Sequence, residues 1–284
     1  MDRETFLGVL SFVGARRKEE GGFGATPLLP ATVEDTYRAL RILEILCRIN
    51  RLRRIVTCRR HEGSLERYVA KAVDTPWVSS RTTFQILYCA SSIGLAVDSP
   101  KLTEYILRRL ANKPYLTERY YCSRILKEIM GVRDMTNWPK ARMSTFFKWR
   151  TARELLMKLY LHQGVFAIEP SRKQAMVQWV QTCQNSDGGF GFLPGTTSYI
   201  ENSHASIWAL ALLDAKPLDP DAAIHFVLAC RTGRGGFARN PGAAPFLDAT
   251  WHAVAVLSLL RNPKDCREIG PSLNPKGQRI GGVQ

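Results

Sequence analysis

The sequence predicts an all-α protein with the architecture of an α/α toroid, in which six helical hairpins form an inner and an outer ring of helices. Two observations lead to this prediction. A turn with the letters GGF occurs three times, each time before an apolar stretch, which indicates an internal repeat. Helical stretches also alternate along the chain, and the second of each pair is the more apolar one. We expect residues 1–270 to form a single toroid domain and residues 271–284 a C-terminal tail.

The three GGF segments align without a gap from their double glycines, which begin at Gly21, Gly188 and Gly235. The clearest copies of the repeat cover residues 16–46, 172–214 and 219–261. Each copy runs from the turn through a loop rich in Pro or Gly into an apolar helix. Each of these helices starts with an acidic residue and, two positions later, a residue with a hydroxyl group. The pairs are Glu34 and Thr36, Glu201 and Ser203, and Asp248 and Thr250.

The shared acids and hydroxyls have a structural explanation as well as a functional one. A carboxylate or hydroxyl at a helix start can accept the unpaired backbone N–H groups of the first turn. The glycines of the turn are likewise expected to close the preceding helix in a left-handed conformation. The repeat is therefore predicted to be a helix, a glycine turn and a second helix.

The helix pairs continue through the middle of the chain, where the GGF turns are missing. In the third GGF copy, outside this middle part, Asp219 and Pro220 are a typical cap and first residue for the helix that precedes the apolar stretch "HAVAVLSLL". The fourth pair consists of "KARMSTFFKW" (140–149) and "TARELLMKLYLHQGV". An open solenoid would use similar units but would keep its inner helices more polar. The second helices are predicted to begin near Glu34, Ser80, Glu118, Thr151, Glu201 and Asp248.

The chain carries a formal charge of +15, concentrated most densely in the run "CRINRLRRIVTCRR". This run could attract an anion such as nucleic acid, the face of an acidic membrane or a diphosphate, or it could be a solvated helix face. No nucleic-acid-binding motif accompanies it, so we expect no specific nucleic acid partner. Its arginines are Arg48, Arg51, Arg53, Arg54, Arg59 and Arg60.

Cysteine usage and the hydropathy pattern indicate a cytoplasmic protein. The seven cysteines are scattered, without a CxxC pair, as expected of reduced thiols. No apolar run is long enough to cross a membrane, and "MDRETFLGVL" begins with charges rather than with the core of a signal peptide.

The second repeat carries a resemblance to a known family. "CQNSDGGFGF", followed by "SHASIWALALL", resembles the repeat of the prenyltransferase and squalene-cyclase superfamily, with Gln184, Gly188 and Phe190 on its QxxxGx-aromatic pattern. "GGFGATPLLPATVEDTYRAL" resembles the first repeat of protein prenyltransferase β subunits, and Cys183 and Cys230 also match that repeat. The resemblance is specific over residues 16–46 and 172–261.

The resemblance implies a toroid whose central apolar cavity takes an isoprenoid chain. Aromatic rings suit such a wall because they offer large apolar areas and π faces that stabilise carbocations. Aromatic residues at helical spacing are also typical of an ordinary core. The rings near the starts of the second helices are Tyr37, Tyr120, Trp208 and Trp251, which we expect to contact the substrate.

The resemblance to protein prenyltransferases implies a zinc ion that holds an acceptor thiolate. The Asp-x-Cys step of those relatives falls on "YIENSHASIW", where the pair becomes Glu201/Ser203 or Asn202/His204, and their ligand histidine falls on Ala249. The arginine and lysine of the loop before that step have no counterpart in "FGFLPGTTSY".

Another set of zinc ligands remains open. It comprises one acid–histidine pair on each of two neighbouring helices: Glu201 with His204, and Asp248 with His252. The alternative is that the acids cap helices and the histidines pack.

The resemblance to terpenoid cyclases implies a proton donor in a DxDD motif, which this sequence lacks. "TVEDT" places Glu34 and Asp35 in the corresponding region as candidate catalytic acids, and a helix cap is the alternative role. We therefore expect an isoprenoid-handling enzyme, first a prenyltransferase-like transferase with an α-subunit-like partner and second a terpene cyclase. The alternative is a non-catalytic toroid that binds an isoprenoid, a protein or an acidic membrane through its basic run.

Overall fold

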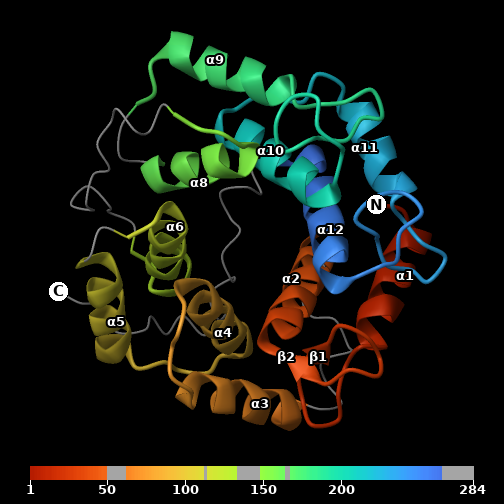
Figure 1. Ribbon diagram of the computed structural model, residues 1–284. Coiled ribbons are helices and arrows are strands. Elements are labelled where there is room, and N and C mark those ends of the chain that lie inside the picture. The colour runs from red at the N-terminus through yellow and green to blue at the C-terminus, as the bar shows by residue number, and fades with distance from the viewer. Residues whose placement is uncertain (50–61, 112–113, 133–147, 164–166, 264–284) are drawn as a thin grey trace. The chain divides into compact units, whose positions relative to one another are not determined.

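The computed structural model describes residues 1–49, 62–111, 114–132, 148–163 and 167–263 of the 284-residue chain. These residues are mostly helical (Figure 1), and the strands among them form one short antiparallel ribbon of β1 (Phe23–Gly24) and β2 (Ala31–Thr32). Most of the basic run, residues 140–147 of the helix expected over 140–149, and the tail 271–284 lie outside the described residues.

The predicted second helices are all present, and each begins within two residues of its expected position. The described residues also contain the first helices that precede five of the second helices. They are α1 (Arg3–Gly14), α3 (Glu62–Asp74), α5 (Ser99–Ala111), α9 (Pro170–Gln181) and α11 (Pro220–Ala229). The second helices are α2 (Val33–Ile49), α4 (Ser80–Ile93), α6 (Leu116–Arg124), α8 (Ala152–His162), α10 (Ile200–Leu212) and α12 (Leu247–Arg261).

Burial separates the two kinds of helix as the apolar patterns predict. Helix α10 is buried along nearly its whole length, whereas α9 buries only Met176 and Val180. A helix that is apolar around most of its surface must be enclosed by other elements, while a helix with one apolar stripe can face water. Helix α11 begins as expected, with Asp219 accepting the Ala222 N–H (2.8 Å) and Pro220 at the first position.

The repeated hydroxyls tie each GGF turn to the helix that follows it. In every copy, the backbone N–H of the turn phenylalanine donates to the hydroxyl at the helix start, and the distance is 3.0 Å each time. The cap of α2 is instead Thr32, which accepts the Asp35 N–H (3.0 Å). The repeated pairs are Phe23 with Thr36, Phe190 with Ser203, and Phe237 with Thr250.

The first glycine of each turn touches the backbone of another helix. Gly188 has a φ of +85°, and a Cβ there would lie 2.1 Å from the carbonyl oxygen of Ala222 in α11. In the third copy, Gly235 makes the same approach to Gly8, so the N-terminal helix α1 takes the place that α11 has in the second copy. No side chain fits at these two positions.

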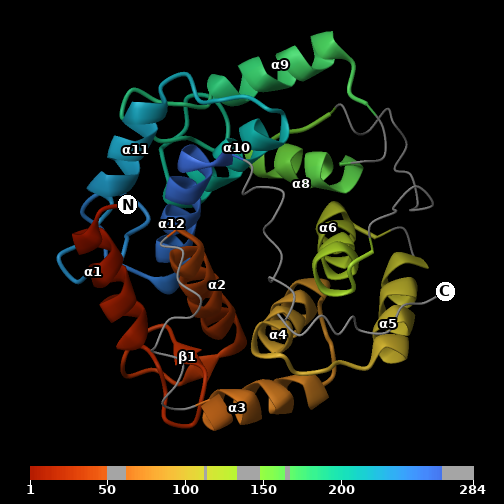
Figure 2. The same ribbon diagram turned by 180° about the vertical axis from the view of Figure 1, so that it is seen from behind.

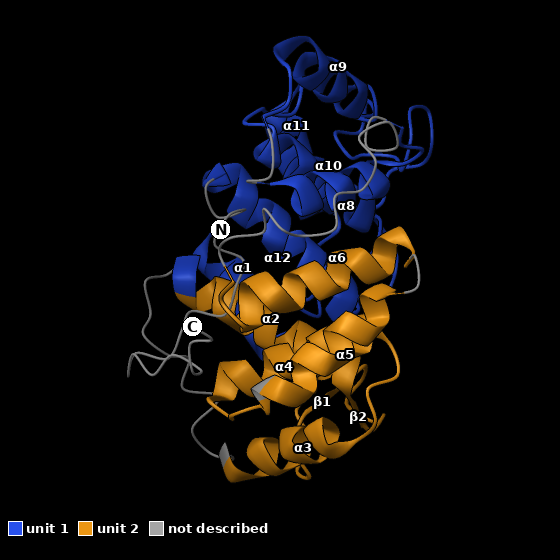
Figure 3. Ribbon diagram, turned by 90° about the vertical axis from the view of Figure 1, so that its left-hand side faces the viewer, with its two compact units in different colours: residues 1–13, 48–50, 134–268 blue, residues 14–47, 51–133, 269–284 orange. Residues whose placement is uncertain are grey.

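The chain divides into two compact units (Figure 3). One comprises residues 1–13, 48–50 and 134–268, and in it α10 packs against both α8 and α12 (Figures 1 and 2). The other comprises residues 14–47, 51–133 and 269–284, and in it α4 packs against α3, α6 and the π-helix η2 (Ile125–Ile129). Among the described residues, no helix combines the length and the apolar character needed to cross a bilayer.

Candidate functional site

In the unit that contains α10 and α12, four rings form what we call the histidine cluster: His204, Trp208, Trp251 and His252. His204 and Trp208 are one turn apart on α10, and their rings stack with centroids 5.5 Å apart and an interplanar angle of 21°. The His204 ring meets Trp251 of α12 edge-on at 4.8 Å and 85°. His204, Trp208 and Trp251 are each less than 9% exposed, so the cluster belongs to the interior.

The two histidines are joined by a short contact between their rings. The Nδ1 atoms of His204 and His252 lie 2.8 Å apart, so one must donate a proton and the other must accept it. The Nε2 atom of His252 lies 3.6 Å from Oδ1 of Asp248, one turn back on α12. The structure thus brings three of the four predicted zinc ligands near one another.

The fourth predicted ligand, Glu201, points to a different partner. Its carboxylate forms an ion pair and hydrogen bond with Arg239, whose guanidinium also lies 4.0 Å from the centre of the Tyr199 ring. Within the described part of the chain, no three His, Cys, Asp or Glu side chains gather closely enough to hold a metal ion. Zinc needs about four ligands around one point, and the donors in this arrangement do not fit it. The side-chain positions in this structure thus give no support to a zinc site at these residues, and the site stays a prediction.

In the other unit, aromatic rings and buried arginines form what we call the arginine cluster. Tyr37 of α2 contacts Phe84 (5.8 Å, 71°) and Tyr88 (5.2 Å, 85°) of α4 edge-on. The Arg124 guanidinium of α6 lies over the Phe84 ring at 4.0 Å and near Tyr120 at 5.7 Å. The cluster therefore presents both π faces and positive charge. Its members are Tyr37, Arg41, Glu44, Phe84, Tyr88, Tyr120, Arg124 and Glu128.

Two ion pairs balance the charge in the arginine cluster. Arg124 makes two hydrogen bonds to the Glu128 carboxylate, 2.6 and 2.8 Å long, and the side chains of both residues are less than 10% exposed. Nη1 of Arg41 lies 3.8 Å from Glu44, which also accepts the Tyr88 hydroxyl. Buried charges persist only when they are paired and hydrogen-bonded, as these are. Glu128 lies in η2, and such wide turns often mark functional sites.

Burial shifts several pKa values in the two units. Burial by itself would lower the pKa of Arg124, but Glu128 and the neighbouring tyrosines raise it well above its ordinary value, so the guanidinium stays charged. Burial raises the pKa of the Tyr120 hydroxyl above its ordinary value. It also raises the pKa of the repeat thiols, Cys183 to about 11 and Cys230 to about 12, which makes both poor nucleophiles near neutral pH.

The candidate catalytic acids lie at the start of α2. Glu34 forms ion pairs with Arg38 (3.6 Å) and Arg81, and its side chain is about half exposed. Asp35 accepts a hydrogen bond from the Thr32 hydroxyl (2.6 Å). Each acid therefore has a polar partner at the start of α2. The role of either acid as a proton donor stays a prediction.

Sequence reasoning did not single out the charged members of the arginine cluster. A signal was present, because "YRALRILEIL" and "SRILKEI" each place an arginine three or four residues before a glutamate inside an apolar helix. Such spacing allows an ion pair within one helix. Of the four predicted substrate-contacting rings, Trp208 and Trp251 lie in the histidine cluster and Tyr37 and Tyr120 in the arginine cluster.

The repeat places one ring at the same position of three second helices. The residue directly after the shared hydroxyl is Tyr37, His204 or Trp251, and each is less than 9% exposed. Helix pairs with a GGF turn, a hydroxyl that ties the turn to an enclosed helix, and a ring beside that hydroxyl define the class of this protein.

The chain belongs to the prenyltransferase α/α-toroid family. The family model described as "Prenyltransferase alpha-alpha toroid domain" matches residues 1–112 and again residues 117–260. The match confirms both the predicted toroid and the resemblance noted in the sequence. No curated protein matches the chain.

Proposed function

We propose that the protein binds an isoprenoid chain against the aromatic side chains of its second helices. The observation that carries the proposal is the gathering of buried rings on these helices in both units, in a family that is defined by its prenyltransferase toroid. Flat rings present a large apolar area to a hydrocarbon chain, branched or not, and the chain needs no polar group to bind to them.

The same rings suit a reaction in which the chain becomes positively charged. Loss of diphosphate from a prenyl group, or protonation of a polyene, creates a carbocation that π faces stabilise. We therefore propose an enzyme, first a prenyltransferase-like transferase and second a cyclase. For the cyclase, Glu34 and Asp35 remain the proposed proton donors, and Asp35 is the better one because Glu34 is already paired with two arginines.

A second function is favoured by the ion pairs of the helix-start acids. Glu34 forms ion pairs with Arg38 and Arg81, and Glu201 forms one with Arg239, so these carboxylates stabilise the folded structure. A toroid whose acids are engaged in this way could bind an isoprenoid or a protein without catalysis. A prenyltransferase that modifies proteins would in addition need an α-subunit-like partner. The scattered cysteines are consistent with a cytoplasmic location.

The binding proposal is tested with farnesyl diphosphate, geranylgeranyl diphosphate and squalene. Binding is followed by tryptophan fluorescence for the wild type, for Trp208→Leu and for Trp179→Leu as the matched control on α9, outside both clusters. We expect Trp208→Leu to weaken binding by about tenfold, since it removes a large stacking surface, and Trp179→Leu to leave it unchanged. Equal affinities in the two variants would contradict the proposal.

Two further measurements separate enzyme from binding protein. Analysis of the products by mass spectrometry detects diphosphate release, transfer or cyclisation, and binding without any product supports the non-catalytic alternative. Metal analysis of the purified protein tests zinc: stoichiometric zinc that is lost in an Asp248→Ala, His204→Ala double variant would support the predicted ligand set, and metal-free protein would rule it out. Activity of a strict monomer would exclude the need for an α-subunit-like partner.

A further inference from the structure

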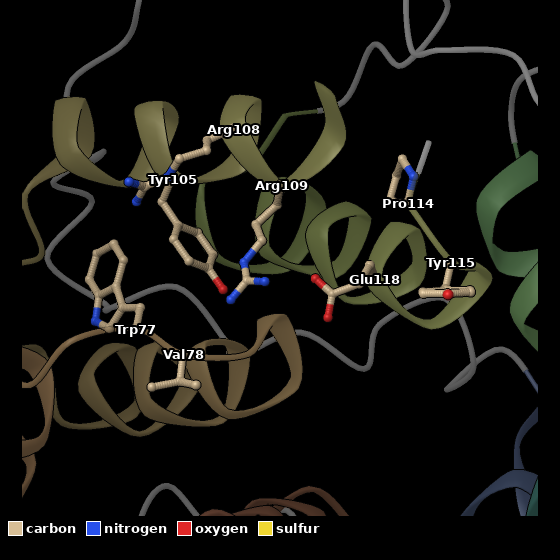
Figure 4. Close-up of a pocket in the computed structure, with 8 residues that line it drawn as sticks. All are labelled: Trp77, Val78, Tyr105, Arg108, Arg109, Pro114, Tyr115 and Glu118. Carbon is tan, nitrogen blue, oxygen red and sulfur yellow. The ribbon is translucent and has the colours of Figure 1, made fainter. Parts of the chain in front are cut away.

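The second unit contains a pocket that none of the predicted site residues line. It has a volume of about 490 Å³ and lies between α5, the start of α6 and the segment before α4 (Figure 4). Pockets of 300–1,000 Å³ are typical of small-molecule sites. Its main side chains are Trp77, Tyr105, Arg108, Arg109, Tyr115 and Glu118.

The pocket carries an excess of positive charge. Among the described residues, neither Arg108 nor Arg109 has a carboxylate oxygen within 4.0 Å, in contrast to the paired arginines of the arginine cluster. Lys101, which does not line the pocket, lies nearby, with Nζ 5.2 Å from the centre of the Trp77 ring. Glu118 is the one acid in the lining, and its carboxylate accepts a hydrogen bond from the Ser80 hydroxyl.

Figure 4 shows how Arg109 and Glu118 lie in the pocket, with Arg108 on the other side of Tyr105. The guanidinium of Arg109 and the carboxylate of Glu118 point toward the same space from α5 and α6, with the Tyr105 ring beside Arg109. The Arg109 guanidinium lies 5.4 Å from the centre of that ring, and the Tyr105 hydroxyl accepts a hydrogen bond from Thr83 (3.1 Å). The ring is therefore fixed in place, and it orients the arginine at the pocket.

The rest of the lining is apolar and includes exposed surface. Trp77 and Tyr105 pack edge to face at 5.5 Å and 85°. Val78 and Tyr115 are 77% and 86% exposed at the pocket, which is unusual for side chains of this size. An apolar ligand body lying here would remove these surfaces from water.

We propose that this pocket binds an organic anion in which a carboxylate or phosphate group is attached to a flat, apolar body. Arg109 holds the anionic group, because a guanidinium binds such oxygens with two parallel hydrogen bonds, and Arg108 adds positive charge to the lining. The body of the ligand packs against Trp77, Val78 and Tyr115. This site is separate from the proposed isoprenoid site, and it stands whether or not that proposal does.

The test uses phenyl phosphate, titrated into the full-length protein by isothermal calorimetry. We expect saturable binding that weakens by about tenfold or more in Arg109→Gln, which loses charge-assisted hydrogen bonds to the anion, and by less in Arg108→Gln, which loses only a nearby charge. Arg119→Gln, on α6 but outside the pocket, is the matched control and should bind as the wild type does.

Further arms of the experiment distinguish the parts of the proposal. Inorganic phosphate should bind more weakly than phenyl phosphate, and hexyl phosphate, which is apolar but not flat, should fall between them. Trp208→Leu should bind phenyl phosphate normally, because its ring belongs to the other unit. If Arg109→Gln has a lowered melting temperature, Arg109→Lys replaces it as the variant that keeps the charge but loses the planar fork.

Absence of saturable binding to the wild type would overturn the proposal. So would equal affinity in the Arg109 and Arg119 variants, or equal affinity for inorganic and phenyl phosphate, which would indicate nonspecific attraction by a basic protein.

Discussion

The histidine cluster and the arginine cluster are built on equivalent helices but differ in polarity. Tyr37 and His204 occupy the same position of the repeat, and one helical turn later the first repeat has Arg41 where the second has Trp208. The tryptophan stacks on His204 and needs no counter-charge. Arg41 is just as deeply buried, at 2% exposure, and is accompanied by Glu44.

The comparison shows that the repeat specifies where a buried side chain lies but not what it contributes. A ring at such a position adds apolar burial, which any neighbouring apolar side chain can complement. A charge there is tolerated only with an acid at the right spacing, so the arginine cluster depends on pairs of residues. The two clusters should therefore respond differently to the loss of a single side chain.

The largest effect is expected from Glu128→Ala in the arginine cluster. The substitution leaves the Arg124 guanidinium buried without its two hydrogen bonds, and the free energy of unfolding should fall by about 3–5 kcal/mol. Urea denaturation measures the loss. The double variant Arg124→Met, Glu128→Leu should recover most of the stability because it removes both charges, and a double variant as unstable as Glu128→Ala would show that charge is not the cause.

The hydroxyls that accept a hydrogen bond from the GGF turns test whether the repeats contribute equally to stability. Thr36→Val and Thr250→Val each leave the buried N–H of the turn phenylalanine without its acceptor, and each should lower the free energy of unfolding by about 1–3 kcal/mol. The two losses should be similar, because the donor–acceptor distance is 3.0 Å in both. Thr117→Val, at an exposed position of α6, is the control; clearly unequal losses would show that the two turns are not energetically equivalent.

A smaller effect is expected from His204→Phe in the histidine cluster. The new ring keeps the stacking on Trp208 and the edge contact with Trp251, and it loses the contact to Nδ1 of His252. We expect a loss of about 0.5–1.5 kcal/mol in urea denaturation, the usual net contribution of one hydrogen bond. A loss as large as that of Glu128→Ala would contradict the distinction between the two clusters.

The smallest effect is expected at the N-terminal cap of α1. The Asp2 carboxylate accepts hydrogen bonds from the Thr5 N–H (2.7 Å) and hydroxyl (2.9 Å), which lower its pKa below 3.8. A lowered pKa in the folded state means that this stabilisation is present above the unfolded pKa and is lost as the pH falls through the folded one. Asp2→Ala should cost about 0.5–1 kcal/mol at pH 7, at the low end for an exposed cap, and less at pH 2. Thermal unfolding at both pH values checks this, and a loss independent of pH would contradict it.

Much of the fold could be predicted from the sequence because local signals agree with the repeat. The GGF turns, the cap at Asp219 and Pro220, and the apolar second helices are read from neighbouring residues, and the structure has each of them. The role of the repeated hydroxyls could not be read in the same way. Thr36 was expected to cap its helix, but its partner is the N–H of Phe23, 13 residues earlier.

The candidate site was predicted less completely, because its contacts join different helices. The sequence placed His204 and His252 on neighbouring helices, and they do meet. It could not indicate that Glu201 turns to Arg239, 38 residues away, nor that Arg124 lies on the ring of Phe84. Side-chain direction across helices depends on how the helices pack, which spacing along one helix does not determine.

The sequence by itself determined the all-α repeat, the positions of the helices and the family to which the toroid belongs. Periodic apolar residues and glycine turns act over a few residues, so they can be recognised without the structure. Only the tertiary structure decided which charges are neutralised. It paired Arg41 and Arg124 with acids, and among the described residues it left Arg108 and Arg109 without a carboxylate oxygen within 4.0 Å. Whether a charged side chain needs a partner depends on the burial and the neighbours that packing gives it.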